Sequence, residues 1–302
     1  MTFILITISI LISVAFYTIL ERKILSYIQI RKGPNKVGLM GILQPFSDAI
    51  KLFNKNLIKL EPMNFILSYL TPSLSLLIMI LIIPIISFNK FSLFDNKHNL
   101  LLFFILSSMG VYFMLLIGWS ANSKYCYLGS IRSVAQMISY EISFFMIILF
   151  IVFLSQSYLF TQMEESQILM EYFLGNMLLL FIWLTSCLAE TNRSPFDFAE
   201  GESELVSGFN VEYMGGLFAM IFLAEYMSMI ILSMISTIMF FKSLFSFPYI
   251  LTVVLISYSL IWVRGTYPRF RYDMLMKLSW KTFLPISLLI ILIPMIIYMM
   301  FF

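Results

Sequence analysis

The segment ETNRSPFDFAEGESELVSGFNVEY, residues 190–213, is an acidic loop between two apolar runs. It holds six carboxylates and one arginine, whereas only 12% of the whole chain is charged and 61% is hydrophobic. Charged side chains next to apolar runs of membrane length are costly, and they usually mark ion, proton or substrate pathways. The loop therefore predicts a membrane protein that uses its carboxylates, which are Glu190, Asp197, Glu200, Glu202, Glu204 and Glu212.

Apolar runs recur along the whole chain, whose mean hydropathy is +0.95. A transmembrane helix needs about 20 apolar residues, and a helix satisfies its own backbone hydrogen bonds in lipid. The sequence therefore predicts an all-α polytopic membrane protein with about eight transmembrane helices, forming a single domain over residues 1–302. The expected spans are 2–20, 63–88, 99–119, 133–158, 170–189, 213–241, 247–264 and 282–302.

Lys and Arg residues divide unevenly between the two sides of these spans. Sixteen of the 19 belong to connections that follow odd-numbered spans, with Arg22, Lys23 and Arg264 counted from the ends of the spans before them. Because basic residues concentrate on the matrix or cytoplasmic side, these connections are expected there and both termini on the other side. The connections are 27–62, 121–132, 190–212 and 265–281.

The first connection predicts an interfacial helix. Over residues 42–60, apolar residues recur at helical spacing, and Asp48 with three lysines takes the other face. This pattern is typical of an amphipathic helix lying in the membrane interface. The alternative is that the basic residues only fix the topology. Just before the connection, Glu21 and Arg22 are neighbours that can pair with each other.

Two carboxylates lie within predicted spans. Glu141 follows the start of its span by about 12 Å and Glu225 by about 18 Å, at 1.5 Å per helical residue. Intramembrane acids usually face other polar groups and carry function, so both are candidates for a proton pathway. The alternative for each is a neutral carboxyl group that bonds a neighbouring helix.

The chain holds few ligands for metals. It has two cysteines, Cys126 and Cys187, and one histidine, His98. An iron–sulfur cluster normally takes four cysteines, and one histidine cannot build a zinc site. No glycine-rich phosphate-binding motif is present. We therefore expect no metal, flavin or iron–sulfur cluster in this chain, and no nucleic-acid partner.

The acidic loop resembles that of one family, chain 1 of NADH:ubiquinone oxidoreductase, respiratory complex I. The other motifs of the family occur in the same order, from about residue 21 to 285. They are ERK at 21–23, QIRKGPN at 29–35, QPFSDA at 44–49, GWS at 118–120, AQMISYE at 135–141, AEY at 224–226 and RGTYPRFRYD at 264–273.

The resemblance implies a place and partners for the chain. In this family the subunit lies between the hydrophilic redox arm and the membrane arm of the mitochondrial inner-membrane enzyme, which implies termini in the intermembrane space. It encloses a ubiquinone chamber together with the quinone-site subunits and the terminal iron–sulfur subunit. Adjacent membrane-arm subunits and lipids complete its surroundings.

The resemblance also implies site residues. Arg22, Asp48, Arg193 and Arg271 match positions of the quinone chamber and its entry. Glu141, Glu190, Asp197, Glu200, Glu202, Glu204, Glu212 and Glu225 match an acidic path that leads away from it. Because neighbouring carboxylates share protons as a group, a charge change in the chamber would redistribute protons along this path.

Three alternatives remain at this point. A secondary cation or proton transporter shares buried acids, but it normally shows internal repeats with broken helices, and none is clear here. The membrane subunit of a related membrane-bound hydrogenase shares several acid motifs but no quinone. The third alternative is a structural anchor for a peripheral enzyme.

The split of basic residues predicts the topology. In sealed mitochondria, a membrane-impermeant reagent should label a cysteine placed near residue 200 only after the inner membrane is opened, because that loop faces the matrix. Labelling from the intermembrane-space side would contradict this orientation.

Overall fold

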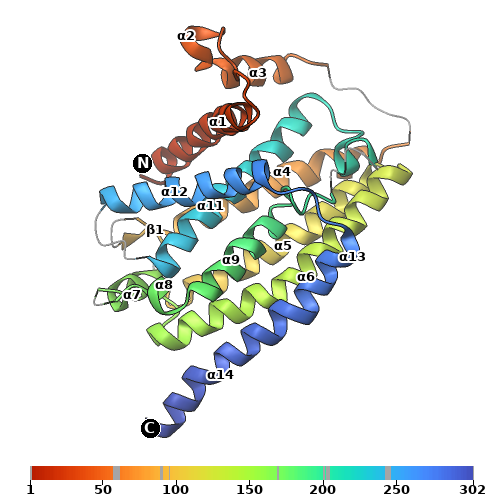
Figure 1. Ribbon diagram of the computed structural model, residues 1–302. Coiled ribbons are helices and arrows are strands. Elements are labelled where there is room, and N and C mark those ends of the chain that lie inside the picture. The colour runs from red at the N-terminus through yellow and green to blue at the C-terminus, as the bar shows by residue number, and fades with distance from the viewer. Residues whose placement is uncertain are drawn as a thin grey trace.

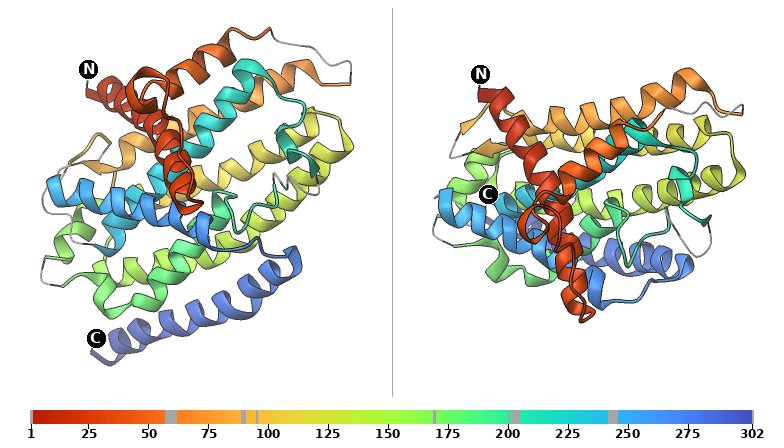
Figure 2. Two further views of the ribbon diagram at one scale, coloured as in Figure 1. Left: turned by 45° about the horizontal axis from the view of Figure 1, so that its top comes forward. Right: turned by 90° about the horizontal axis from the view of Figure 1, so that it is seen from above.

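The fold is a bundle of tilted helices (Figures 1 and 2). The computed structural model describes residues 2–56, 62–88, 91–94, 96–168, 170–199, 201, 205–241 and 246–301. The bundle packs α4 (Phe65–Ile82) with α5 (Asn99–Ser120) and α11 (Gly215–Phe240), and α6 (Lys124–Ser155) with α5, α9 (Met177–Glu190) and α14 (Leu284–Phe301). Helices α1 (Thr2–Ile28) and α12 (Ser246–Thr266) cover α11 on one side. The fold class predicted from the sequence is therefore confirmed.

Seven helical segments of the described chain are long and apolar enough to cross a membrane. They contain α1 (Thr2–Ile28), α4 with the 3-10 turn η1 (Phe65–Ile82 and Ile83–Ile85), α5 (Asn99–Ser120), α6 (Lys124–Ser155), α11 (Gly215–Phe240), α12 (Ser246–Thr266), and the continuous run α13, η3 and α14 (Tyr272–Leu278, Ser279–Phe283 and Leu284–Phe301). Within that last run, η3 is a single π-helical turn.

The fifth expected span, 170–189, is shorter than predicted. It divides into α8 (Tyr172–Gly175) and α9 (Met177–Glu190). Asn176 separates the two helices directly after Gly175, and both are residues that favour turns. The 14 residues of α9 span about 21 Å at 1.5 Å each, which is less than the hydrocarbon core of about 30 Å.

Short elements close the ends of the bundle. They are α2 (Gly38–Gly41), α3 (Gln44–Phe53), the strands β1 (Ser87–Phe88) and β2 (Phe91–Ser92), α7 (Phe160–Ser166) and the 3-10 turn η2 (Gly208–Asn210). The start of α1 and the end of α14 lie toward the end of the bundle that also carries β1, α7 and α8, and α2 and α3 lie toward the other end (Figure 1).

The expected amphipathic helix is present in part. Helix α3 covers residues 44–53 of the predicted 42–60, and residues 57–61 lie outside the described part of the chain. Its apolar face meets the bundle where the ring of Phe46 lies 6.0 Å from that of Phe16 in α1. Ile50 and Phe53 remain exposed, as expected of a helix that lies against lipid or a partner.

An aromatic stack fills the centre of the bundle. Trp183 of α9 stacks on Phe144 of α6 with ring centroids 4.3 Å apart, and Phe240 of α11 lies 6.1 Å from the same indole. All three side chains are buried. Aromatic contacts of this kind join the three helices in the half of the bundle away from the acidic loop.

The acidic loop docks on α6 through a close backbone approach. At Gly129, an added Cβ would lie 3.0 Å from the nitrogen of Phe209, 3.1 Å from the oxygen of Ala199 and 3.2 Å from the carbonyl carbon of Gly208. A side chain at this position would therefore push the loop away from α6.

Replacement of Gly129 should loosen this docking. Gly129→Val should destabilise the folded chain by about 1–3 kcal/mol, the usual cost of overpacking, measured as a lower thermal transition of the purified complex. Gly175→Ala is the matched control, because nothing lies within 4 Å of its added Cβ. Equal transitions for the two variants would contradict the close approach.

Candidate functional site

The end of α9 aims Arg193 into the bundle. Asn192 adopts a left-handed conformation, with φ 51°, and its N–H bonds the carbonyl of Ala189 while that of Arg193 bonds the carbonyl of Leu188. This pattern is a Schellman motif, which ends a helix and reverses the chain direction. Gln136 of α6 then fixes the turn, because its buried amide donates to the carbonyls of Ala189 at 2.8 Å and Phe196 at 2.9 Å.

Arg193 occupies a buried position between an acid and an aromatic ring. Its guanidinium lies 3.4 Å from the carboxylate of Glu225 in α11, and the two side chains are only 6% and 15% exposed. The same guanidinium lies 4.4 Å from the ring centroid of Tyr226 and 6.0 Å from that of Phe222. The pair compensates two charges that would each be costly to bury alone, and the ring face adds a cation–π contact.

A second charge pair meets the same tyrosine. The hydroxyl of Tyr226 donates to Oε2 of Glu21 in α1 at 2.6 Å, and Arg264 of α12 pairs with Oε1 of that carboxylate. The side chain of Glu21 is 4% exposed. The sequence allows Glu21 and Arg22 to pair with each other, but in the structure Glu21 pairs with Arg264 and Arg22 with Asp48. Glu21 turns inward toward α11 and α12.

Two neighbouring cavities join the intramembrane acids. The first lies between α5, α6 and α9, with Glu141 and Glu190 in its wall. The second is lined by Glu190 and Glu225 with residues of α4, α5 and α11. Glu190 thus borders both cavities. Glu141 and Glu225 both line cavities between helices, as predicted.

Arg22 forms the outer part of the site. Its guanidinium lies 2.8 Å from Asp48 of α3, and Gln44 donates to the other oxygen of that carboxylate at 2.9 Å. The pair is exposed, so its contribution to stability is small. It ties α3 to the end of α1, beside the buried Glu21.

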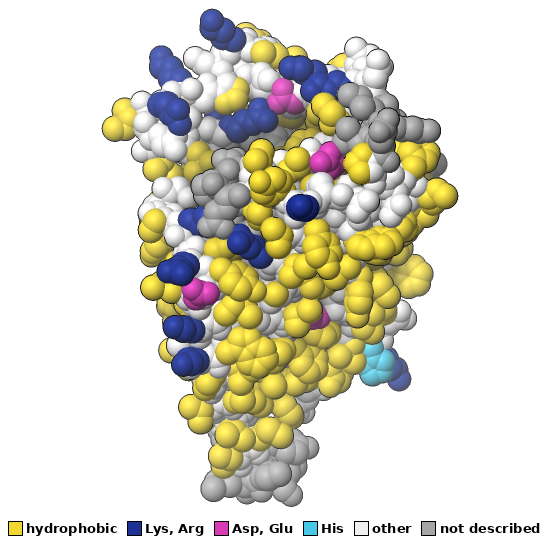
Figure 3. All heavy atoms as spheres, turned by 90° about the vertical axis from the view of Figure 1, so that its right-hand side faces the viewer, with side chains coloured by type: hydrophobic (Ala, Val, Ile, Leu, Met, Phe, Trp, Pro, Cys, Tyr) yellow, Lys and Arg dark blue, Asp and Glu magenta, His cyan; other side chains and the backbone are white. Residues whose placement is uncertain are grey.

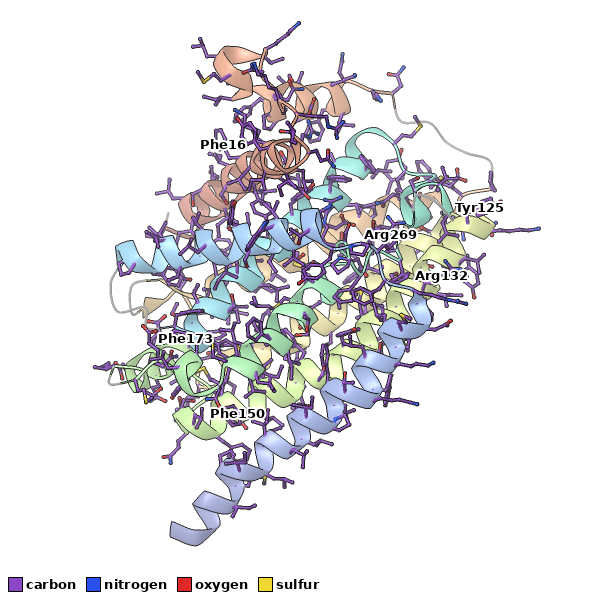
Figure 4. The ribbon with its side chains drawn as sticks, viewed as in Figure 1. Phe16, Tyr125, Arg132, Phe150, Phe173 and Arg269 are labelled. Atoms are coloured by element: carbon purple, nitrogen blue, oxygen red, sulfur yellow. The ribbon has the colours of Figure 1, made fainter. Side chains whose placement is uncertain are left out.

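A separate polar cleft of about 1010 Å³ lies where the acidic loop meets the segment after α12. Asp197 pairs with Arg269 at 3.1 Å and Arg271 with Asp273 at 3.1 Å. Arg132 of α6 also lines it. Figure 4 places Arg132 and Arg269 toward the end of the bundle away from Phe173.

Lys and Arg side chains also gather over α2 and α3, at the top of Figure 3.

Tyr213 anchors the far end of the acidic loop. Its hydroxyl lies 2.7 Å from the hydroxyl of Ser120 and donates to the carbonyl of Ile117 at 3.0 Å. Burial, which disfavours the phenolate, raises the pKa of Tyr213. Its neighbour Glu212 is half-buried. The loop is therefore held at both ends, by Gln136 near its start and by Tyr213 at its end.

The structure brings some of the expected site residues together and separates others. Glu141, Glu190 and Glu225 share the two cavities with Arg193 at the edge, and Arg22 meets Asp48, whereas Asp197 and Arg271 lie in the polar cleft. Asp197 is not helical. Glu200, Glu202 and Glu204 lie outside the described residues.

Three further residues belong to this network, namely Glu21, Tyr226 and Arg264. The sequence carried a signal for two of them, because each is a charge at the inner end of an apolar span. Tyr226 follows Glu225 directly and carries no charge, so its role depends on the fold. Within the described part of the chain, no group of three His, Cys, Asp or Glu side chains is placed to hold a metal ion.

The fold and the site define a class: a polytopic helical membrane protein with a buried network of acids and arginines beside a polar loop. The sequence model of the NADH dehydrogenase family matches residues 1–295, and the chain belongs to that family.

Named relatives agree with this assignment. The chain is 50% identical to NADH-ubiquinone oxidoreductase chain 1 of Aedes aegypti, over 94% of this chain and 91% of the relative. The protein of that name from Anopheles gambiae is 51% identical, over 94% and 90%, and that from Coturnix japonica is 46% identical, over 93% and 89%.

Loss of the Tyr213 hydroxyl should weaken the anchored loop. Tyr213→Phe removes two buried hydrogen bonds, each typically worth about 0.5–1.5 kcal/mol, while the carbonyl of Ile117 keeps the N–H of Ala121 as a donor. The expected result is faster proteolysis at a cleavage site engineered into the loop. Tyr112→Phe, at an exposed tyrosine of α5, should leave the rate unchanged, and equal rates for both variants would contradict the anchor.

Proposed function

We propose that this chain is a core membrane subunit of a proton-pumping NADH:ubiquinone oxidoreductase. The chain helps to form the ubiquinone chamber, and its buried carboxylates couple quinone reduction to proton movement. It supplies no complete active site alone, because electrons reach the quinone from a partner. The observation that carries the proposal is Glu190, which borders two cavities and so connects Glu141 with Glu225 and Arg193.

The arrangement of the acids supports proton transfer. Carboxylates that share a cavity exchange protons as a group, and the charge on one affects the others. Glu225 pairs with Arg193, while Glu190 and Glu141 share a wall away from that pair. A change in charge near Arg193 would therefore alter the protonation of Glu190 and then of Glu141.

The outer residues support a place for the quinone. Helices α1, α3 and α11 meet where the Arg22 and Asp48 pair lies outside and Glu21 lies inside. The apolar face of α3 suits an isoprenoid tail, and the paired charges suit the polar head group. Arg271 and Asp197, in the polar cleft, would instead face the neighbouring hydrophilic subunits.

The proposal places one transmembrane domain in the mitochondrial inner membrane, with both termini in the intermembrane space and the acidic loop in the matrix. Its partners are the quinone-site and terminal iron–sulfur subunits, adjacent membrane-arm subunits and lipids. Ubiquinone is a substrate bound jointly with the first two. The relatives' names favour this function over a hydrogenase subunit, a transporter or a structural anchor.

Replacement of Arg193 tests the proposal. Arg193→Ala leaves the Glu225 carboxylate buried without this partner, and breaking such a pair typically costs about 3–5 kcal/mol. We expect inhibitor-sensitive quinone reduction and proton pumping to fall by about tenfold or more, while electron transfer from NADH to an artificial acceptor continues. Arg193→Lys should retain only part of the quinone reduction and proton pumping, because an ammonium group lacks the guanidinium fork.

Two controls make the result specific. Arg31→Ala removes an exposed arginine outside the buried network, and the variant complexes must be assembled, as judged by native gels and flavin content. Glu190→Gln should lower the number of protons pumped per electron in the same assays. Normal quinone reduction and normal pumping in assembled Arg193→Ala and Glu190→Gln complexes would refute the proposed function.

A further inference from the structure

Tyr226 contacts both buried charge pairs. Its hydroxyl donates to Glu21, which pairs with Arg264, and its ring supports Arg193, which pairs with Glu225. The first pair lies between α1 and α12, beside Arg22. The second lies at the edge of the acid-lined cavity. The side chain therefore spans from the outer part of the site to the inner part.

We propose that Tyr226 is a positioning residue that holds the Arg193 guanidinium against Glu225 and makes that alignment depend on Glu21. This inference rests on the proposed function, because it assigns Tyr226 a part in the same coupling.

The geometry gives each half of the phenol a distinct task. A hydrogen bond to an ionised acceptor is shorter and stronger than one between neutral groups, and the 2.6 Å bond to Glu21 fixes the ring in its plane. The ring centroid then lies 4.4 Å below the guanidinium carbon. Because a guanidinium stacks on an aromatic face, the fixed ring sets the plane in which Arg193 presents its N–H groups.

The bond to Glu21 also affects the strength of the ring contact. Hydrogen bonds in a low-dielectric site polarise one another, so a phenol that donates to a carboxylate presents a more negative ring face to the cation above it. A change in the charge or pairing of Glu21 would weaken this contact and release Arg193. The same bond that orders the ring therefore makes Arg193 sensitive to events beside α1.

The alternative is that Tyr226 only provides a hydrogen-bond donor to the buried carboxylate of Glu21. Phe222 contributes to the ring surface near Arg193, at 6.0 Å, and the rings of Phe222 and Tyr226 lie 5.5 Å apart. If packing alone mattered, a phenylalanine at position 226 would suffice. The two explanations differ in whether the effect of the hydroxyl depends on Arg193.

The test is a double-mutant cycle in the assembled complex. In the parent enzyme, Tyr226→Phe should lower kcat for inhibitor-sensitive quinone reduction by about tenfold, as the loss of a hydrogen bond to a charged acceptor implies. The KM for quinone should stay unchanged, and so should the rate of NADH oxidation by an artificial acceptor. In an Arg193→Lys background the same change should cost at most about twofold, because an ammonium group has no plane to align.

Tyr17→Phe is the matched control. Tyr17 lies on α1 with its ring 6.0 Å from that of Tyr226, and its hydroxyl donates to the carbonyl of Ser257 in α12 at 3.1 Å. The replacement removes a buried phenolic hydroxyl from the same helix interface, and the lost hydrogen bond is to a backbone carbonyl, so kcat should be unchanged. Equal losses for Tyr226→Phe in both backgrounds, or no loss in either, would overturn the inference.

Glu21→Gln provides a second route if Tyr226→Phe does not assemble. This substitution keeps the tyrosine but replaces the ionised acceptor by a weaker neutral one. The loss of kcat that it causes should also be smaller in the Arg193→Lys background. An undiminished loss would overturn the inference. Normal quinone reduction and normal pumping in the assembled Arg193→Ala and Glu190→Gln complexes would instead refute the proposed function, so the two failures are distinguishable.

Discussion

A guanidinium buried in an apolar bundle must be compensated where it lies, and much of the site follows from this constraint on Arg193. An uncompensated ion at such a position costs several kcal/mol. Glu225 provides the opposite charge, and Tyr226 the aromatic face. Glu225 and Tyr226 are consecutive residues of α11, so the turn after α9 has to dock against α11 beside these two residues. The amide of Gln136 then fixes this turn on α6, and the close approach at Gly129 holds a later part of the acidic loop on the same helix.

The acidic loop is therefore part of the bundle rather than a cover on its surface. Buried backbone groups need partners, and this loop obtains them from side chains of the helices. Gln136 bonds two of its flanking carbonyls, and Tyr213 returns the chain to the end of α5. A loop that is held in this way can transmit a shift of one helix to another. The described carboxylates of the loop, Glu190, Asp197 and Glu212, lie beside these anchored turns, where such a shift would alter their neighbours.

The sequence predicted the inward position of Glu141 and Glu225, because the cost of an acid in lipid leaves few alternatives. It misassigned Glu21, because adjacent opposite charges suggest a pair although neighbours in a helix do not face each other. Arg264, 243 residues away, is the partner, and only tertiary packing brings it there. The length of α9 was also missed, because the apolar run through Gly175 and Asn176 contains a break that hydropathy averages out.

The two halves of the bundle differ in what fills them. Toward the acidic loop, polar side chains of α5, α6 and α9 leave cavities lined by carboxylates. Beyond Phe144, which lines the first cavity, the stacked ring of Trp183 and then Phe240 fill the space between helices. Water and charge are favoured in the first half and disfavoured in the second. A proton on Glu190 therefore has carboxylates as neighbours along the cavities, toward Glu141 on one side and Glu225 on the other, and aromatic carbon along the bundle axis.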